Sequence, residues 1–258
     1  MKKKLLYLSL VICSAFVSCG SEDSKADEKA NAASISPSSI SMYFDGERQL
    51  IGNNVTSWNS NNDFVASVDE NGLVKGAHVG TTQIIGSNGK TSASCQVEIK
   101  AKYNLYDTPI LEWGASRLTI KNKETHVFKS SSTNADFYDY SKNGESYLLE
   151  YLFENDRLKS VSVMGKLSLF PDFGYYLIER YSPISNDPDL FMFADGYTKD
   201  KMTTIVGLQT TKISGTTLSW VMYISSNSLS TKASYDDIKA NDEIITDEKI
   251  QEFIENMK

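Results

Sequence analysis

Alternation of apolar and polar residues is the most consistent pattern along this chain, and it predicts β-strands in two successive regions. The segment Ser92–Lys100 carries a small or apolar residue at every second position. These residues are Ala93, Cys95, Val97 and Ile99. A period of two places them on one face of a strand. Short segments of this kind, separated by turn residues, run from residue 35 to residue 101 and predict an antiparallel β-sandwich.

Several motifs in residues 35–101 resemble a known family. The turn Asp69-Glu70-Asn71-Gly72 lies between apolar pairs, and its glycine can take a positive φ without steric cost. The motifs are Val55-Thr56-Ser57-Trp58-Asn59-Ser60, then Phe64-Val65-Ala66-Ser67-Val68, the turn and Leu73-Val74-Lys75-Gly76, then Val79-Gly80-Thr81-Thr82-Gln83-Ile84. They closely resemble the group 2 bacterial immunoglobulin-like domain. This resemblance implies a small β-sandwich with Trp58 in or near the core and no catalysis. Such domains occur in adhesins and as spacers in cell-surface proteins.

The region from residue 103 to 228 contains two similar halves, each with a short helix followed by strands. In the first half, Ser116 is placed to cap a helix that ends near Lys123, and strands are expected at 135–140, 145–153 and 157–164. In the second half, a helix is expected within 170–181 and strands at 190–194, 202–210 and 217–225. In the last strand, Leu218, Trp220, Met222 and Ile224 share one face, and Val221 and Tyr223 share the other.

This second region also resembles known modules. Trp113-Gly114-Ala115-Ser116 before a short helix, and a hairpin ending in Phe153-Glu154-Asn155-Asp156-Arg157-Leu158, look like a module common in Bacteroides lipoproteins of unknown function. The order of elements resembles the helix-then-sheet repeats of the β-lactamase inhibitor protein and of small outer-membrane assembly lipoproteins. The resemblance implies short helices on one face of a sheet and a second face free for a partner. The predicted fold class is mainly β: an N-terminal immunoglobulin-like β-sandwich, then an α+β domain with an antiparallel sheet, short helices and two tandem repeats.

The N-terminus has the order of a bacterial export signal. Met1-Lys2-Lys3-Lys4 is basic, an apolar run extends from Leu5 to Val17, and Ser18-Cys19-Gly20 is small. The run is shorter than the roughly 20 apolar residues that span a bilayer, so residues 1–18 are expected to be removed. Cys19 resembles the lipidated cysteine of bacterial lipoproteins, with Phe16 in place of the usual leucine three positions earlier. The resemblance implies a membrane anchor at Cys19.

Residues 19–34 are small, polar and charged, which predicts a flexible tether. Glu22 and Asp23 look like the surface-export signal of Bacteroidetes lipoproteins, which implies the outer membrane and the cell surface; a merely soluble linker is the alternative.

The formal charge of −7 becomes −10 once residues 1–18, with three lysines, are removed, and an acidic chain has no attraction to nucleic acid. Of the three cysteines only Cys95 remains free, so no intramolecular disulfide is expected.

Residues able to carry catalysis are few. The two histidines, His78 and His126, lie in different predicted domains, and His78 is expected in a solvated loop. Cys95 is expected to be a buried hydrophobe, and no metal-ligand spacing or phosphate-binding loop occurs, so we predict no metal and no cofactor. Acid pairs are candidates for glycan hydrolysis, although solvated acids on the sheet are the favoured interpretation. These acids are Asp136, Asp139, Glu145, Glu150 and Asp195.

Aromatic residues are dense in the region 103–228. Such rings suit the binding of sugars or protein surfaces, but they suit strand packing equally well, and packing is favoured. The candidate binding residues are Trp113, Tyr138, Tyr140, Tyr175, Tyr176 and Trp220. We expect a non-enzymatic, surface-exposed lipoprotein in which an immunoglobulin-like spacer holds a domain that binds a glycan or protein ligand. The alternatives are an assembly partner of an outer-membrane complex and a carboxylate-dependent glycan hydrolase.

The last region, residues 229–258, starts polar and ends in an amphipathic segment. Ile250, Phe253, Ile254 and Met257 follow the spacing i, i+3, i+4, i+7, which predicts one apolar stripe on a helix capped by Thr246. Docking of this helix onto the preceding domain is favoured over a partner site.

Overall fold

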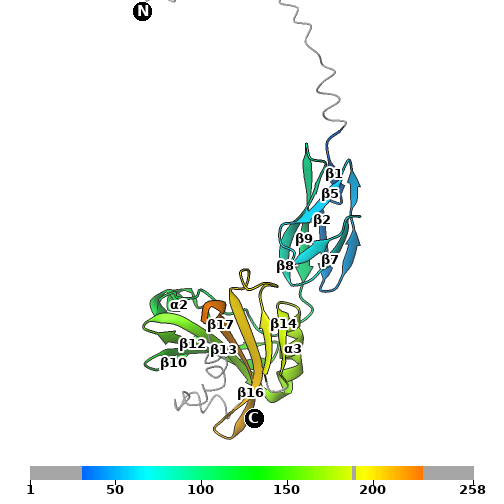
Figure 1. Ribbon diagram of the computed structural model, residues 1–258. Coiled ribbons are helices and arrows are strands. Elements are labelled where there is room, and N and C mark those ends of the chain that lie inside the picture. The colour runs from blue at the N-terminus through cyan, green and yellow to red at the C-terminus, as the bar shows by residue number, and fades with distance from the viewer. Residues whose placement is uncertain (1–30, 188–189, 229–258) are drawn as a thin grey trace, which may run out of the picture.

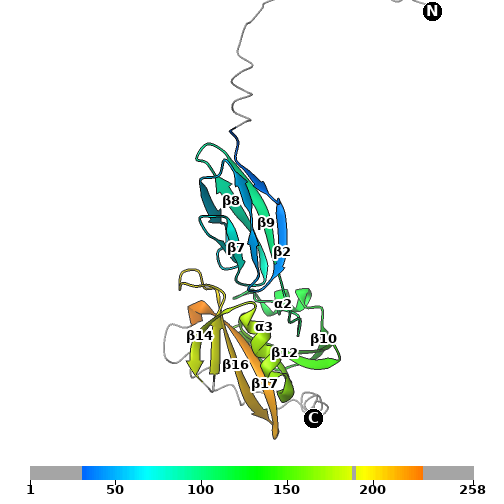
Figure 2. The same cartoon turned by 90° about the vertical axis from the view of Figure 1, so that its right-hand side faces the viewer.

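The computed structural model describes residues 31–187 and 190–228, which form two domains joined end to end (Figures 1 and 2). The first domain contains nine strands. They are β1 Ser34–Ser36, β2 Ser39–Tyr43, β3 Glu47–Gln49, β4 Ile51–Asn53, β5 Ser57–Ser60, β6 Ala66–Val68, β7 Leu73–Gly76, β8 Gly80–Ser87 and β9 Ser92–Lys100. The strands begin at Ser34, one residue inside the predicted tether.

The first domain is a sandwich of small sheets. Strands in the order β2-β9-β8-β5 form one sheet, strands in the order β3-β7-β6 form another, and β1 pairs with β4. The alternation in β9 places Cys95, Val97 and Ile99 in the core, each at most 1% exposed. The predicted turn is also confirmed, because Gly72 has a φ of 82° and Asp69 Oδ1 accepts a hydrogen bond from the Leu73 backbone N–H at 2.7 Å.

Trp58 packs at the margin of this core, as predicted. A Cβ atom added to Gly52 or Gly72 would lie 2.7 or 2.8 Å from Trp58 Cζ2, so the indole ring occupies the space beside both glycines. No larger residue fits at either position without displacing the ring.

The second domain is one large antiparallel sheet with two helices (Figures 1 and 2). Its elements are α2 Arg117–Lys123, β10 Val127–Ser131, β11 Ala135–Lys142, β12 Glu145–Glu154, β13 Arg157–Lys166, the 3₁₀ turn Leu167–Leu169, α3 Phe170–Ile178, β14 Ser182–Asp187, β15 Leu190–Ala194, β16 Thr204–Ile213, β17 Thr216–Ser225 and the 3₁₀ turn Ser226–Ser228. The strand order is β10-β11-β12-β13-β17-β16-β15-β14.

Each half of this domain is a helix followed by four strands, and β13 pairs with β17 where the halves meet. Ser116 caps α2 as predicted, since its Oγ accepts a hydrogen bond from the Thr119 N–H at 3.2 Å. Sequence reasoning did not predict β10 or β14. Both are edge strands interrupted by a shift of register, which destroys a clean alternation.

The sheet has two apolar faces. On the helix face, Val221 and Tyr223 pack with Phe173 and Tyr176 of α3, and the segment from Tyr103 to Trp113 lies against the same core. The second face consists of Ala135, Phe137, Leu148, Leu152, Met164, Leu190, Met192, Ala194, Met202, Ile205, Ile213, Leu218, Trp220, Met222 and Ile224. The predicted division of β17 between two faces is confirmed.

Within the described residues, no helix combines the length and apolar character needed to cross a bilayer. The export segment 1–18, the tether residues Cys19, Glu22 and Asp23, and the helix predicted near the C-terminus lie outside the described residues.

Candidate binding site at the domain junction

Most aromatic residues proposed from the sequence serve packing. Tyr138 and Tyr176 are 3% and 1% exposed in the helix-face core, and Tyr140 and Trp113 pack against that core while partly buried. Trp113 also donates a hydrogen bond from Nε1 to Thr204 Oγ1 at 3.2 Å. Trp220 is buried on the second face. Of the six candidates, Tyr175 alone presents half of its side chain to solvent.

The candidate acids are separated, and two of them are not solvated as predicted. Asp136 is buried and paired with Arg117, whose Nη2 lies 2.7 Å from Asp136 Oδ1. Asp139 pairs with Lys129, Glu145 pairs with Lys166, and Asp195 accepts hydrogen bonds from the Thr203 and Thr204 backbone N–H groups. The prediction of solvated acids is therefore wrong for Asp136, which pairs inside the protein with the first residue of α2.

Glu150 is the second acid for which that prediction is wrong. It lies on the second face beside Phe137 and Ser162 and forms no ion pair with any described residue. Burial raises the pKa of Glu150 to about 7, against the opposing effect of a hydrogen bond with Ser162. The carboxyl group is therefore partly protonated near neutral pH.

The histidines take structural positions. His78 was expected in a solvated loop, but it is 6% exposed and stacks on Phe64 with ring centroids 3.9 Å apart. Its Nδ1 lies 2.6 Å from the Phe64 carbonyl oxygen, and its Nε2 lies 3.3 Å from Ser182 Oγ in the second domain. His126 pairs with Glu124 at 2.6 Å and stacks on Tyr140. The prediction failed for His78 because a loop of the first domain becomes interior once the second domain packs on it.

The junction between the domains is built around Glu179, at the end of α3. Its buried carboxylate accepts hydrogen bonds from the backbone N–H groups of Lys102 and Tyr103, each at 3.0 Å. Its backbone carbonyl accepts another from the Val79 N–H at 2.7 Å. A single residue thus holds both the connecting segment and a loop of the first domain, which fixes the two domains against each other.

Among the described residues, the three tyrosines with the largest exposed fractions flank this junction. Tyr43 is 53% exposed, and Tyr175 and Tyr197 are each 51% exposed. Tyr175 stacks on Tyr103, which follows the connecting residue Lys102, with ring centroids 5.0 Å apart. Tyr197 contacts Phe64 and His78 on another part of the junction. The most exposed tyrosine rings of the described residues thus lie where the domains meet, a common place for ligand sites, whereas the exposed Phe128 and Phe191 lie on β10 and β15.

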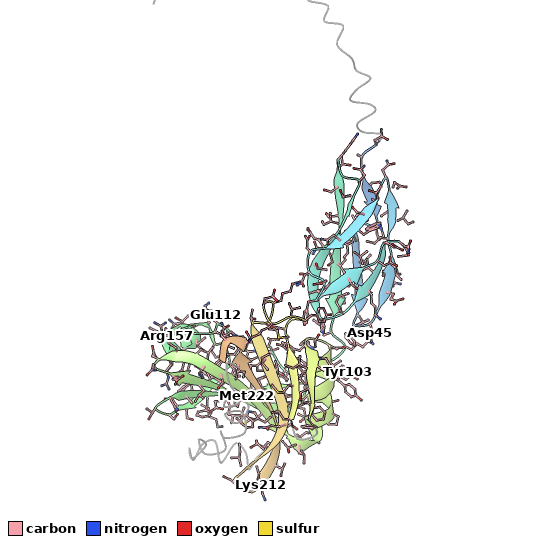
Figure 3. The ribbon with its side chains drawn as sticks, in the orientation of Figure 1. Asp45, Tyr103, Glu112, Arg157, Lys212 and Met222 are labelled. Atoms are coloured by element: carbon pink, nitrogen blue, oxygen red, sulfur yellow. The ribbon has the colours of Figure 1, made fainter. Side chains whose placement is uncertain are left out.

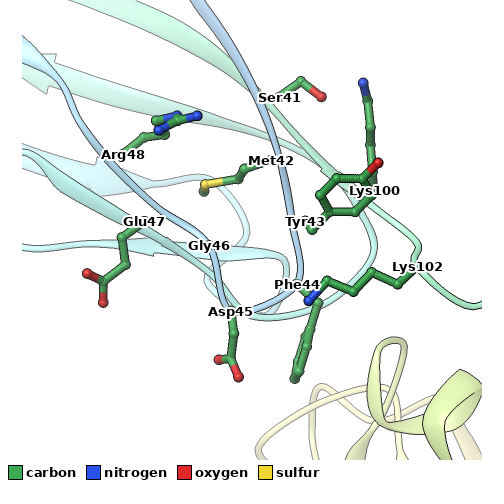
Figure 4. A pocket seen from close by; sticks show the side chains of 10 residues that line it. All are labelled: Ser41, Met42, Tyr43, Phe44, Asp45, Gly46, Glu47, Arg48, Lys100 and Lys102. Atoms are coloured by element: carbon green, nitrogen blue, oxygen red, sulfur yellow. The ribbon is translucent and has the colours of Figure 1, made fainter.

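Two hollows lined by described residues adjoin the junction. The larger, here called the junction hollow, has a volume of about 570 Å³ and is lined by residues 41–48, Lys100 and Lys102 (Figure 4). Asp45 belongs to this lining. Figure 3 shows it at the end of the first domain that faces Tyr103 of the second domain. The smaller hollow, of about 260 Å³, lies between residues 61–64 and a loop that includes Tyr197 and Lys201.

The lining of the junction hollow combines an aromatic ring with cations. Tyr43 and Lys100 are paired neighbours in the parallel strands β2 and β9, so their side chains leave the same face of the sheet. Lys102 extends beside them in Figure 4, and Phe44 points from the adjacent turn. Arg48 and Lys102 form no ion pair with described residues, although Asp45 and Glu47 belong to the same lining. This wall suits a ligand with an apolar face and acidic groups.

A family comparison accounts for part of the chain. The model of the bacterial Ig-like domain (group 2) matches residues 48–99. The first domain is an Ig-like domain. A search of the curated proteins found no match. Most of the junction hollow, residues 41–47 with Lys100 and Lys102, lies outside the matched segment of the Ig-like domain.

Sequence reasoning missed this hollow because it depends on a parallel pairing between distant segments. The alternation in Ser39–Tyr43 places Met42 inward and Tyr43 outward, which is a readable signal for an exposed tyrosine. Its neighbour Lys100 comes from a strand 57 positions later, and no local pattern reports that contact.

Proposed function

We propose that this protein is a surface-exposed outer-membrane lipoprotein, anchored through Cys19, that binds a glycan at the junction hollow without catalysing a reaction on it. The Ig-like domain places the second domain away from the membrane, and the Glu179 contacts keep the two domains in one orientation. The exposed ring of Tyr43 beside Lys100 and Lys102 in the lining of this hollow is the observation that carries the proposal.

The chemistry of the hollow favours a sugar with acidic substituents. Tyrosine offers a flat apolar ring for the face of a sugar and a hydroxyl group for its edge. Lys100 and Lys102 beside Tyr43 supply charge for carboxylate or sulfate groups, in a chain whose overall charge is negative. A volume of about 570 Å³ lies within the usual range for small-ligand sites and accommodates a short oligosaccharide.

Binding can be tested by applying residues 20–258 to an array of neutral, carboxylated and sulfated glycans. We expect retention on acidic glycans, loss of retention in Tyr43→Ala, and no loss in Tyr197→Ala, a residue of the same type and similar exposure beside the smaller hollow. Equal retention of Tyr43→Ala would contradict the site. Recovery of a stoichiometric outer-membrane protein from cells, with no glycan retained, would favour the assembly alternative.

Anchoring and display need separate measurements. We expect labelled palmitate to enter the full chain and to be absent from Cys19→Ser, whereas Cys13→Ser should keep the label. Protease applied to intact cells should remove the protein if it faces outward, and replacement of Glu22 and Asp23 by alanine should protect it. Survival of the native chain would place it in the periplasm.

A further inference from the structure

The second face of the sheet is buried, although the helices and the connecting segment lie on the other face. The described residues of this face lie on strands, except Met202. Met164, Met222 and Trp220 are only 1%, 3% and 4% exposed. A single sheet needs another layer over each apolar face, so this face requires a cover.

Trp220 lies at the centre of this face. Its Nε1 atom is buried and has no hydrogen-bond partner among the described residues. A buried indole N–H normally donates to an acceptor. Because β17 lies next to β13 at the middle of the sheet, this donor marks the central part of the face.

We infer that residues 229–258 of the same chain form the covering layer, with the apolar stripe Ile250, Phe253, Ile254 and Met257 packed on the second face. This segment follows directly from β17, through the turn Ser226–Ser228. The residues from 229 to 246 can extend over roughly 60 Å, which exceeds the width of about 38 Å for eight adjacent strands. The tail can therefore reach any part of the face.

The dimensions and polarity of the stripe also match. A helix over residues 246–257 has a length of about 18 Å, enough to cross about four strands. Its opposite side carries Glu248, Glu252 and Glu255, which remain in solvent when the stripe faces the sheet. Methionine side chains on the face adapt readily to a packed helix.

Thiol accessibility tests the cover in residues 20–258 carrying Met222→Cys. Cys95 is a suitable silent background because it is fully buried. We expect the introduced thiol to resist a thiol reagent and to react about tenfold faster or more when Phe253→Asp and Ile254→Asp are added. The matched pair Glu252→Gln and Glu255→Gln should leave the rate unchanged. A fast reaction of the introduced thiol with the native tail present would overturn the inference and indicate that a partner covers the face.

A disulfide scan keeps the test independent of destabilising changes. Cysteines placed singly at 250, 253, 254 and 257 are combined with Met222→Cys or Met164→Cys and mildly oxidised. We expect at least one of these pairs to cross-link within the monomer, and Glu248→Cys or Glu252→Cys to cross-link with neither partner. Absence of every cross-link from the stripe, or equal cross-linking from both sides of the helix, would overturn the inference.

Discussion

The two domains bury their strands in different ways. In the Ig-like domain, small sheets share one core, and β9 alternates between buried and exposed residues along its whole length. In the second domain, β17 is buried at seven successive positions because both faces of its sheet are covered. The comparison shows that alternation identifies a strand, but it reveals the exposed side only where one face meets solvent.

The helix-face core gives the largest expected effect. Phe173→Ala removes a fully buried ring from between α3 and the sheet and should lower the free energy of unfolding by about 3–5 kcal/mol. Hydrogen exchange should accelerate in β13 and β17, whereas β8 and β9 of the Ig-like domain keep their protection. Uniform acceleration in both domains would show that they share one cooperative unit.

Replacement of the buried acid Glu150 on the second face should raise the free energy of unfolding, whereas Phe173→Ala lowers it. The pKa of Glu150 in the folded protein, about 7, lies above its ordinary value of 4.5, so its stabilising contribution is complete below pH 4.5 and is lost as the pH rises through 7. Glu150→Gln should therefore raise the free energy of unfolding by about 2 kcal/mol at pH 8 and change it little at pH 4.

Chemical denaturation at the two pH values measures this difference. Glu154→Gln, at the exposed end of the same strand, is the control: it removes only a solvent-exposed pair with Lys159 and should change the stability little at either pH. A loss of stability in Glu150→Gln at pH 8 would mean that the ionised carboxylate has a partner on this face.

The junction should be weakened without unfolding either domain. Glu179→Gln leaves one acceptor oxygen where two receive hydrogen bonds from the connecting segment, which should cost about 1–2 kcal/mol. Limited proteolysis should then cut near Lys102 faster than in the native chain. The exposed Glu98→Gln should be cut at the native rate, and an uncut Glu179→Gln chain would contradict the role of this residue.

The smallest expected effect is a weakening of the domain junction at low pH. Burial lowers the pKa of His78 below its ordinary value of 6.5, although hydrogen bonds with the Phe64 and Tyr181 backbones oppose the change. Its stabilising contribution is therefore complete above pH 6.5 and declines as the pH falls further. We expect cleavage near Lys102 to rise modestly between pH 7.5 and pH 5. His78→Gln should remove this dependence, and His126→Gln should retain it.

The sequence predicts the strands, turns and helix caps better than it predicts which side chains are exposed. Cys95, Gly72 and the Ser116 cap follow from local patterns, and the structure confirms each of them. Whether Tyr138 or Tyr175 faces solvent depends on where helices and connecting segments pack, which alternation along one strand does not report. Burial of His78 and the pairing of Tyr43 with Lys100 likewise arise from contacts between distant segments.

The most direct test of ligand binding at the junction is a calorimetric titration of residues 20–258 with the best acidic glycan from the array. We expect Tyr43→Ala to lower the affinity by about tenfold or more, Lys102→Gln to weaken both the binding and its salt dependence, and Tyr197→Ala to bind as the native chain does. An unchanged affinity in Tyr43→Ala and Lys102→Gln, with a loss in Tyr197→Ala, would contradict binding at the junction hollow.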